Sequence, residues 1–184
     1  MENGFNYYRI KTGWVAENGD GSLTKKKTEE LVLASSYTEA EKVACAIAED
    51  QNRAQFGSLF TFEIVKTKIG ELLYNSTLRY DDTLTEGLVT SYFEEDDSTG
   101  TGLYAVKVMY IELDEKSGKE KYSSDTIYTP ATSNADASDI VERFLKKNET
   151  RDFVIRDSKY DRAESILWSP QVHKEKLEAS KQLK

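Results

Sequence analysis

The stretch Tyr104–Lys121, YAVKVMYIELDEKSGKEK, decides the fold of this chain because a similar pattern occurs near the N-terminus. Largely apolar residues occupy every second position from Tyr104 to Tyr110, and again from Tyr8 to Trp14, 96 residues earlier. Alternation of this kind predicts β-strands with one buried face. Each run is followed by a glycine-containing turn and a more polar strand, so the sequence predicts two β-hairpins.

Each predicted hairpin is followed by a helix with one pattern of buried positions. Thr38-Glu39-Ala40-Glu41 predicts a capping box for the first helix, and Ser133 or Asn134 is expected to cap the second. The first helix is expected to end between Asn52 and Gly57. Within each predicted helix, apolar residues follow the spacing i, i+3, i+4, i+7, i+8 of one helical face. They are Ala40, Val43, Ala44, Ile47 and Ala48 in the first helix, and Ala137, Ile140, Val141, Phe144 and Leu145 in the second.

A further strand and a short apolar segment follow each helix. The strands contain Phe60, Phe62 and Ile64, then Phe153 and Ile155; the closing segments are Leu72-Leu73-Tyr74 and Ile166-Leu167-Trp168. The sequence therefore predicts an α+β fold: two tandem ββαβ repeats forming a mainly antiparallel sheet, with two helices packed on one face. Two separate small domains are the alternative, disfavoured because about 70 residues make a marginal core. The expected division is 1–74 for the first repeat, 75–103 for an acidic connector, 104–169 for the second repeat, and 170–184 for a polar tail, frayed or disordered.

The net charge of −8 is concentrated in the predicted connector. Seven acidic residues there stand against Arg79 alone: Asp81, Asp82, Glu86, Glu94, Glu95, Asp96 and Asp97. The segment Leu88–Phe93 is apolar enough for a short strand within it. An acidic chain ordinarily disfavours nucleic acid, but the remainder of this one is close to neutral.

The segments Tyr110–Lys121, YIELDEKSGKEK, and Ser36–Ala44, SYTEAEKVA, resemble an uncharacterised family of short proteins from Bacteroidetes and their crAss-like gut phages. The resemblance covers most of the chain from Phe5 to Trp168 and departs in the longer connector and the tail. It implies a phage or prophage setting, in the bacterial host cytoplasm or the virion, and provides no catalytic residues. The N-terminus has no signal peptide pattern, and no apolar run reaches the roughly 20 residues of a membrane span, so we expect no membrane partner.

The sequence argues against an enzyme. His173 is the only histidine and lies in the predicted tail, which excludes histidine-based triads and metal clusters. Cys45 is the only cysteine, and its place in the first helix predicts a packed thiol. Adjacent acidic residues in a polar loop are usually solvated rather than bound to Mg²⁺ or Ca²⁺. We therefore expect no catalytic residue, no metal and no cofactor.

A binding face is the remaining candidate. If Tyr8, Ile10, Trp14 and their counterparts Tyr104, Val106 and Tyr110 point at the helices, the opposite face of the sheet carries aromatic and cationic residues. These are Tyr7, Arg9, Lys11, Lys26, Lys107, Tyr122 and Tyr128. Rings that stack on bases and cations that meet phosphates are typical of proteins that bind single strands. The simpler interpretation is that tyrosine and lysine suit any exposed strand.

Three functions follow as hypotheses. The first is a non-enzymatic accessory protein that binds single-stranded DNA through the open face of its sheet. The second is a structural or assembly protein that associates with itself or with other phage proteins through strand edges or the tyrosine-rich face. The third is an inhibitor of host defence that acts by sequestration.

Overall fold

The computed structural model describes residues 4–50, 61–82, 87–93 and 100–183. The predicted end of the first helix, Phe60 and the acidic residues Glu86 and 94–97 lie outside these ranges. The chain forms two compact units: unit 1 comprises residues 1–67, 79–93 and 163–174, and unit 2 comprises 68–78, 94–162 and 175–184. The predicted boundaries after residues 74, 103 and 169 do not coincide with this division.

The predicted α+β class is confirmed, with three helices in the described residues and mostly antiparallel strand pairs. The strands form two sheets, however, rather than the single sheet that the sequence suggested. None of the helices in the described part of the chain has the length and apolar character of a membrane span.

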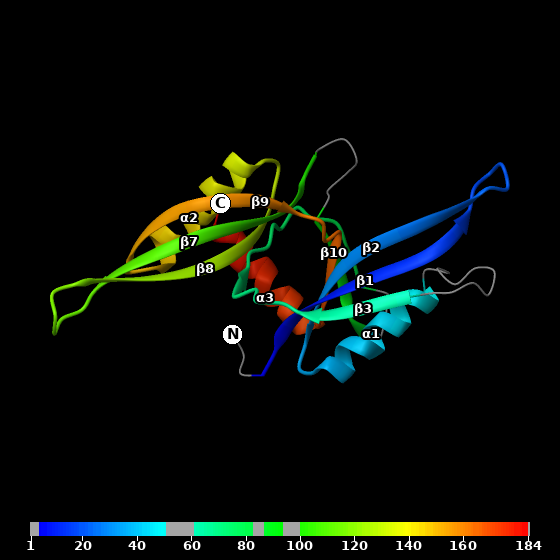
Figure 1. Cartoon of the computed structure of the whole chain (residues 1–184), viewed down its shortest axis with the longest axis horizontal. Helices are drawn as coiled ribbons and strands as arrows, with labels where there is room; N and C mark the ends of the chain where they lie inside the picture. The colour runs from blue at the N-terminus through cyan, green and yellow to red at the C-terminus, as the bar shows by residue number, and fades with distance from the viewer. Residues whose placement is uncertain (1–3, 51–60, 83–86, 94–99, 184) are drawn as a thin grey trace. The chain divides into compact units, whose positions relative to one another are not determined.

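Unit 1 is built on a six-stranded sheet with the order β3-β1-β2-β10-β6-β5. Figure 1 labels β3, β1, β2 and β10 of this sheet. Its elements are β1 (Asn6–Glu17), β2 (Leu23–Ala34), α1 (Tyr37–Asp50), β3 (Thr61–Lys66), β5 (Tyr80–Asp81), β6 (Val89–Tyr92) and β10 (Ser165–Trp168). The pair β10–β2 is parallel, and the other neighbouring pairs of this sheet are antiparallel. Part of the predicted connector therefore belongs to this sheet, since β5 and β6 come from it.

Helix α1 covers one face of this sheet. The core joins Tyr8, Ile10, Val32, Ala34 and Leu167 of the strands to Ala40, Val43, Ala44 and Ile47 of the helix, as the two periodicities predicted. Cys45 is exposed rather than packed, because it lies between the buried positions of the helix and off their face.

The cap of α1 differs from the predicted one. The amide of Glu39 donates to the Ser36 hydroxyl at 3.2 Å, and the Glu39 carboxylate accepts from the amide and hydroxyl of Ser35 at 2.7 and 2.6 Å. The two hydrogen bonds from Ser35, that of its hydroxyl first and that of its amide second, lower the pKa of the Glu39 carboxyl. Ser36 rather than Thr38 is the cap because the helix already begins at Tyr37.

The opposite face of the unit 1 sheet carries the first turn of α3 (Pro170–Lys181). Because Leu167 packs against α1, its neighbour Trp168 lies on this opposite face, where its indole N–H donates to the Ser91 hydroxyl at 3.1 Å. The His173 ring is 6 % exposed, and its centroid lies 4.5 Å from that of Tyr80. The predicted polar tail is therefore a helix with a buried face.

The burial of His173 predicts a pH dependence of stability. Burial lowers the pKa of the imidazole, and the charge of Asp82 opposes this effect. A group whose folded pKa lies below its unfolded value of about 6.5 stabilises the fold fully above that pH and progressively less below it. The free energy of unfolding should fall between about pH 7.5 and about pH 5.5, and His173→Gln should reduce this fall. Urea denaturation at the two pH values measures both; an equal fall in both proteins would contradict the prediction.

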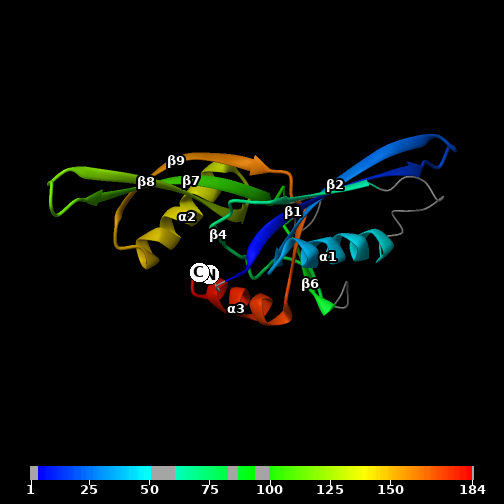
Figure 2. The same cartoon turned by 60° about the horizontal axis from the view of Figure 1, so that its bottom comes forward.

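Unit 2 is built on a four-stranded sheet with the order β4-β8-β7-β9, and α2 lies along one face of it (Figure 2). Its elements are β4 (Glu71–Leu72), β7 (Gly102–Leu113), β8 (Glu120–Ala131), α2 (Asn134–Asn148), β9 (Asp152–Asp161) and the second part of α3. The core joins Val106, Val108, Tyr110 and Ile127 to Ala137, Val141 and Leu145, with Ile140 and Phe144 packed against them. The predicted buried face of the second helix is thus confirmed.

Helix α2 begins with the same capping arrangement as α1. Ser133 accepts from the amide of Asp136 at 3.1 Å, and the Asp136 carboxylate accepts from the amide and hydroxyl of Thr132 at 2.9 and 3.1 Å. Of the two predicted caps, Ser133 is therefore the one used.

The two sheets share one arrangement of four strands, and the fourth strand is exchanged. The order β3-β1-β2-β10 in unit 1 corresponds to β9-β7-β8-β4 in unit 2, and the last strand of each is parallel to its neighbour. The segment after the first helix contributes β4 to unit 2, whereas the segment after the second contributes β10 to unit 1. β4 thus lies in the sheet of β7 and β8, and β10 lies in the sheet of β1 and β2. The duplication of the sequence itself stays a prediction.

The exchanged strand β4 predicts a large effect from a single leucine. Leu72 is fully buried, whereas Leu113 at the end of β7 is 71 % exposed. Leu72→Ala should lower the free energy of unfolding by about 2–5 kcal/mol, because it leaves a cavity in the core. Leu113→Ala removes the same atoms at the surface and should change stability by less than about 0.5 kcal/mol. Urea denaturation of both variants checks this, and equal effects would contradict the placement of β4.

Candidate nucleic-acid interface

The structure removes Tyr7 and Arg9 of β1 from the predicted exposed face. Tyr7 is 5 % exposed, and the Arg9 guanidinium lies 3.0 Å from the Glu29 carboxylate, with both side chains largely covered. The inner part of this face also carries Leu31 and Ile166, which are paired with each other and fully buried. The face is therefore open only toward the turn of the hairpin, where Lys11 is exposed.

The register of the hairpin places Lys26 on the other face from Lys11. Directly opposite residues of an antiparallel pair share a face, and Lys26 is opposite Trp14. Lys25 and Lys27 lie opposite Val15 and Gly13, so they share the face of Lys11. The sequence showed the run of three lysines, but only one of them was selected, and its face was wrong.

We call residues 11–17 and 23–28 of β1 and β2 the lysine ribbon. Its lysines are exposed, and Lys11 lies 4.0 Å from the Glu63 carboxylate. Lys25, Lys26 and Lys27 have no ion-pair partner among the residues that the structure describes. The ribbon therefore carries lysine side chains on both of its faces.

The turn that closes the lysine ribbon is held by its own polar groups. The side-chain amide of Asn18 donates to the hydroxyls of Ser22 and Thr24 at 2.8 and 2.6 Å. Gly21 closes the turn with a φ of +83°, which favours glycine. These contacts fix the end of the ribbon and, with it, the direction of the lysines.

In unit 2 the three remaining predicted residues do share a face. Lys107 is opposite Thr126, and Tyr122 and Tyr128 lie opposite Ile111 and Ala105, so all three belong to the face away from α2. Lys107 is exposed, Tyr122 is 58 % exposed and Tyr128 is half-buried. The Tyr122 hydroxyl donates to the Glu120 carboxylate, which raises the pKa of the tyrosine.

The charges on this open face of unit 2 are mixed. Arg156, at the irregularity of β9, donates to the Met109 sulfur at 3.6 Å. Lys107 is opposite Asp157, which also lies 3.6 Å from the Lys159 ammonium. The face carries three cations and four acidic residues, placed by the register and, for Arg156, by its contact with Met109: Lys107, Arg156, Lys159, Glu120, Asp152, Asp157 and Asp161. The lysine ribbon is therefore the more basic surface.

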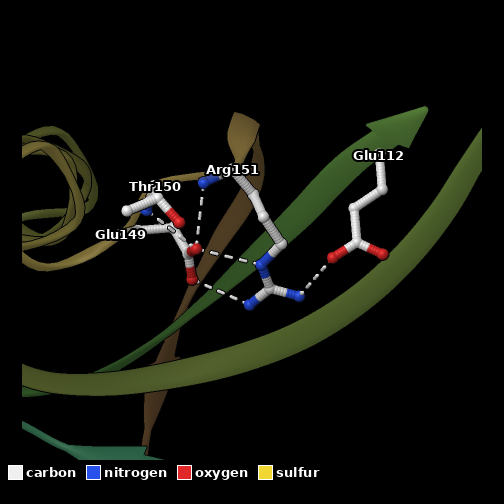
Figure 3. A network of polar contacts seen from close by, with 4 residues as sticks. All are labelled: Glu112, Glu149, Thr150 and Arg151. Carbon is white, nitrogen blue, oxygen red and sulfur yellow. Dashed lines mark hydrogen bonds and ion pairs between the residues drawn. The ribbon is translucent and has the colours of Figure 1, made fainter. Parts of the chain in front are cut away.

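Arg151 is a further cation of unit 2, and its charge is fully used within the protein (Figure 3). Its Nε and Nη2 donate to the two oxygens of Glu149 at 2.9 and 2.7 Å, and Nη1 lies 3.4 Å from Glu112. The guanidinium carbon lies 4.1 Å from the centre of the Tyr110 ring. Since Glu149 caps the end of α2 and Glu112 belongs to β7, Arg151 fastens the helix to the sheet.

The Arg151 side chain predicts an unusually acidic carboxyl. Its hydrogen bond, followed by backbone hydrogen bonds to the same group, lowers the pKa of Glu149 to about 2. Carbon-detected NMR titration of the side-chain carboxyls should therefore find the Glu149 midpoint at about 2, and Arg151→Met should raise it. Arg143→Met, on the exposed side of α2, serves as the control and should leave the midpoint in place. An unchanged midpoint in Arg151→Met would contradict the network.

Other chemistry is sparse in the described residues. Within 4–50, 61–82, 87–93 and 100–183, no group of three or more histidine, cysteine, aspartate or glutamate side chains is placed to hold a metal ion. The surfaces with distinctive composition are thus the lysine ribbon and the open face of unit 2. Of the residues missed by the sequence analysis, Lys25 and Lys27 were visible in the lysine run, whereas Arg156 gave no signal.

The fold and these surfaces define an α+β protein of two sheets with a basic hairpin on one of them. The chain belongs to the family described as Domain of unknown function (DUF4494), whose family model matches residues 6–166. Neither a curated protein nor a solved structure matches the chain.

Proposed function

We propose that this chain is a non-enzymatic protein that binds single-stranded DNA, and that the lysine ribbon contacts the phosphates. The observation that carries the proposal is the run Lys25-Lys26-Lys27, exposed and without ion-pair partners in the described residues, in a chain whose net charge is −8. Lysines that neutralise phosphates release counterions, and this release dominates the affinity for nucleic acid.

Because its lysines lie on both faces, the ribbon suits a flexible single strand of DNA better than a flat sheet surface would. Successive residues of a β-strand point to opposite faces, so Lys25 and Lys27 serve one face and Lys26 serves the other. A single strand is flexible enough to follow both faces of a narrow ribbon. Trp14, opposite Lys26 and half-buried, offers a ring beside a cation, and stacking of a base on such a ring contributes about 1–3 kcal/mol.

The biological setting is part of the proposal. The resemblance of Ser36–Ala44 and Tyr110–Lys121 to proteins of Bacteroidetes and their phages supports an accessory protein of a phage that acts in the bacterial host cytoplasm. Single-stranded DNA arises wherever a genome is copied or recombined, so such a protein would meet its ligand there.

The second candidate function is self-assembly through the open face of unit 2. Leu113, Tyr122 and Val154 are 71 %, 58 % and 41 % exposed and lie on one face beside Ile111 and Met109. Contiguous exposed apolar side chains are typical of protein contact surfaces. A mixed set of charges also suits a contact between proteins better than a contact with phosphates.

The lysine ribbon predicts salt-dependent DNA binding. Fluorescence anisotropy of a labelled single-stranded oligonucleotide should show binding that weakens linearly with salt on a log–log scale. Lys25→Ala/Lys26→Ala/Lys27→Ala should reduce the magnitude of the slope by about 2 and weaken binding about 10- to 100-fold at low salt, because three phosphate contacts are lost.

The other hairpin provides a matched control. Lys116 and Lys119 are exposed in the turn between β7 and β8, and Lys121 pairs with Asp114 at 3.1 Å. Lys116→Ala/Lys119→Ala/Lys121→Ala removes the same charge and should leave binding nearly unchanged. Equal losses in the two triple variants would show a general charge effect and overturn the site. No binding at low salt, together with a concentration-dependent mass in light scattering, would favour assembly instead.

A further inference from the structure

A cavity of about 230 Å³ lies within unit 2, apart from the surfaces described above. Strand β4, helix α2 and the second part of α3 surround it. Leu72, Leu73 and Phe144 give it apolar walls, and the ammonium groups of Lys147 and Lys176 give it a positive rim. An apolar cavity with a few convergent polar groups is the usual form of a small-molecule site.

The two ammonium groups are held in place by the protein. Lys176 Nζ lies 2.6 Å from a Glu71 carboxylate oxygen and donates to the Leu72 carbonyl at 2.7 Å. Lys147 Nζ donates to the Gln182 carbonyl at 2.6 Å. Because an ammonium has three N–H donors, Lys176 retains one further donor and Lys147 retains two. A ligand therefore meets cations that are already positioned, which reduces the entropy lost on binding.

The charge around the cavity is unbalanced. Two ammonium groups line it, but Glu71 is the one carboxylate among its described lining residues. A second cavity of about 150 Å³ shares Leu73, Tyr74, Ser180 and Leu183 with the first and adds the guanidinium of Arg143. This part of an acidic chain therefore presents a local excess of positive charge to a partly open cavity with apolar lining residues.

A purely structural role explains the two lysines only in part. The contacts with Glu71 and Gln182 fasten α3 to β4 and α2, and a fastening of this kind works best in a closely packed interface. The space beside the lysines remains open instead, and its lining combines apolar side chains with lysines that have further N–H donors. That combination fits an occupant with an apolar body and an anionic head.

We propose that this cavity binds a small amphipathic anion, with its apolar body against Leu72, Leu73 and Phe144 and its carboxylate or phosphate at Lys147 and Lys176. The volume lies below the roughly 300 Å³ at which drug-sized sites begin, so a short alkyl chain fits better than a long lipid. The proposal is independent of DNA binding, because the lysine ribbon belongs to unit 1.

Isothermal titration calorimetry on the full chain tests the site with hexanoate, hexyl phosphate and hexylammonium. Both anions should bind and hexylammonium should bind at least tenfold more weakly; the stronger of the two anions identifies the head group. Lys147→Met should weaken anion binding about tenfold while leaving the Lys176–Glu71 contact intact. Lys146→Met is the matched control, because the neighbouring Lys146 pairs with Glu142 at 2.7 Å and does not line the cavity.

A measurement on the unmodified protein avoids any effect of the substitutions on folding. In methyl NMR spectra, hexanoate should shift the signals of Leu72 and Leu73 and leave the exposed Leu113 unaffected. Shifts at these leucines together with the loss in Lys147→Met establish the site. Equal binding of hexylammonium, unchanged binding in Lys147→Met, or shifts confined to other leucines would each overturn it.

Discussion

The parallel pairing of two short strands is the constraint on which both sheets depend. Leu167 of β10 pairs with Val32 and enters the core under α1, and Leu72 of β4 pairs with Tyr128 and is fully buried. Each strand comes from the half of the chain whose long hairpin lies in the other sheet. Neither half therefore contains all the strands of one sheet, and the chain must pass repeatedly between the two units to complete them. Parallel strands require a long connection. Here the segment between β4 and β8 carries β5, β6 and β7, and the segment between β2 and β10 runs from residue 35 to residue 164.

The sequence was informative wherever a period could be counted. The alternation from Tyr8 to Trp14 and from Tyr104 to Tyr110 located β1 and β7, and the helical spacing located the buried faces of α1 and α2. The exchange of β4 and β10 could not be predicted, because strands of two and four residues are too short to show a period and their apolar side chains suit either sheet. The prediction of the α1 cap was wrong for a different reason. The sequence SSYTEAE contains two hydroxyl–carboxylate pairs at the capping spacing, Ser36 with Glu39 and Thr38 with Glu41. Only the residue at which the helix begins decides between them.

The candidate site was predicted in part, and one residue in a turn explains the error. Five residues separate β1 from β2, whereas six separate β7 from β8. Ile10 is consequently paired with Glu30, and Val106 is paired with Ile127. Val106 lies 96 residues after Ile10, whereas Ile127 lies 97 residues after Glu30. A shift of one residue reverses the face of every side chain in the second strand. The prediction, which did not include this difference, placed Lys26 on the face of Lys11, whereas Lys107, Tyr122 and Tyr128 do share one face. The burial of Tyr7 had no local signal, since it depends on what covers the sheet.

The positions of acidic side chains decide which cations remain available to a ligand. Arg9 is neutralised by Glu29, Arg151 by Glu149 and Glu112, and Lys11 has Glu63 within 4.0 Å. The Arg9 pair lies at the inner part of the hairpin and the Arg151 pairs lie at the end of a helix, where a fixed charge pair holds elements together. Toward the turn of the first hairpin the acidic residues thin out, and Lys25, Lys26 and Lys27 have no such neighbour in the described residues. In a chain of net charge −8, long-range repulsion opposes any polyanion, so contact with phosphates is favourable only where a local cluster is not cancelled by its own surroundings. Under the proposed function, that condition places the phosphate contacts on the outer half of the ribbon and excludes Arg9, although the sequence analysis selected both Arg9 and Lys26.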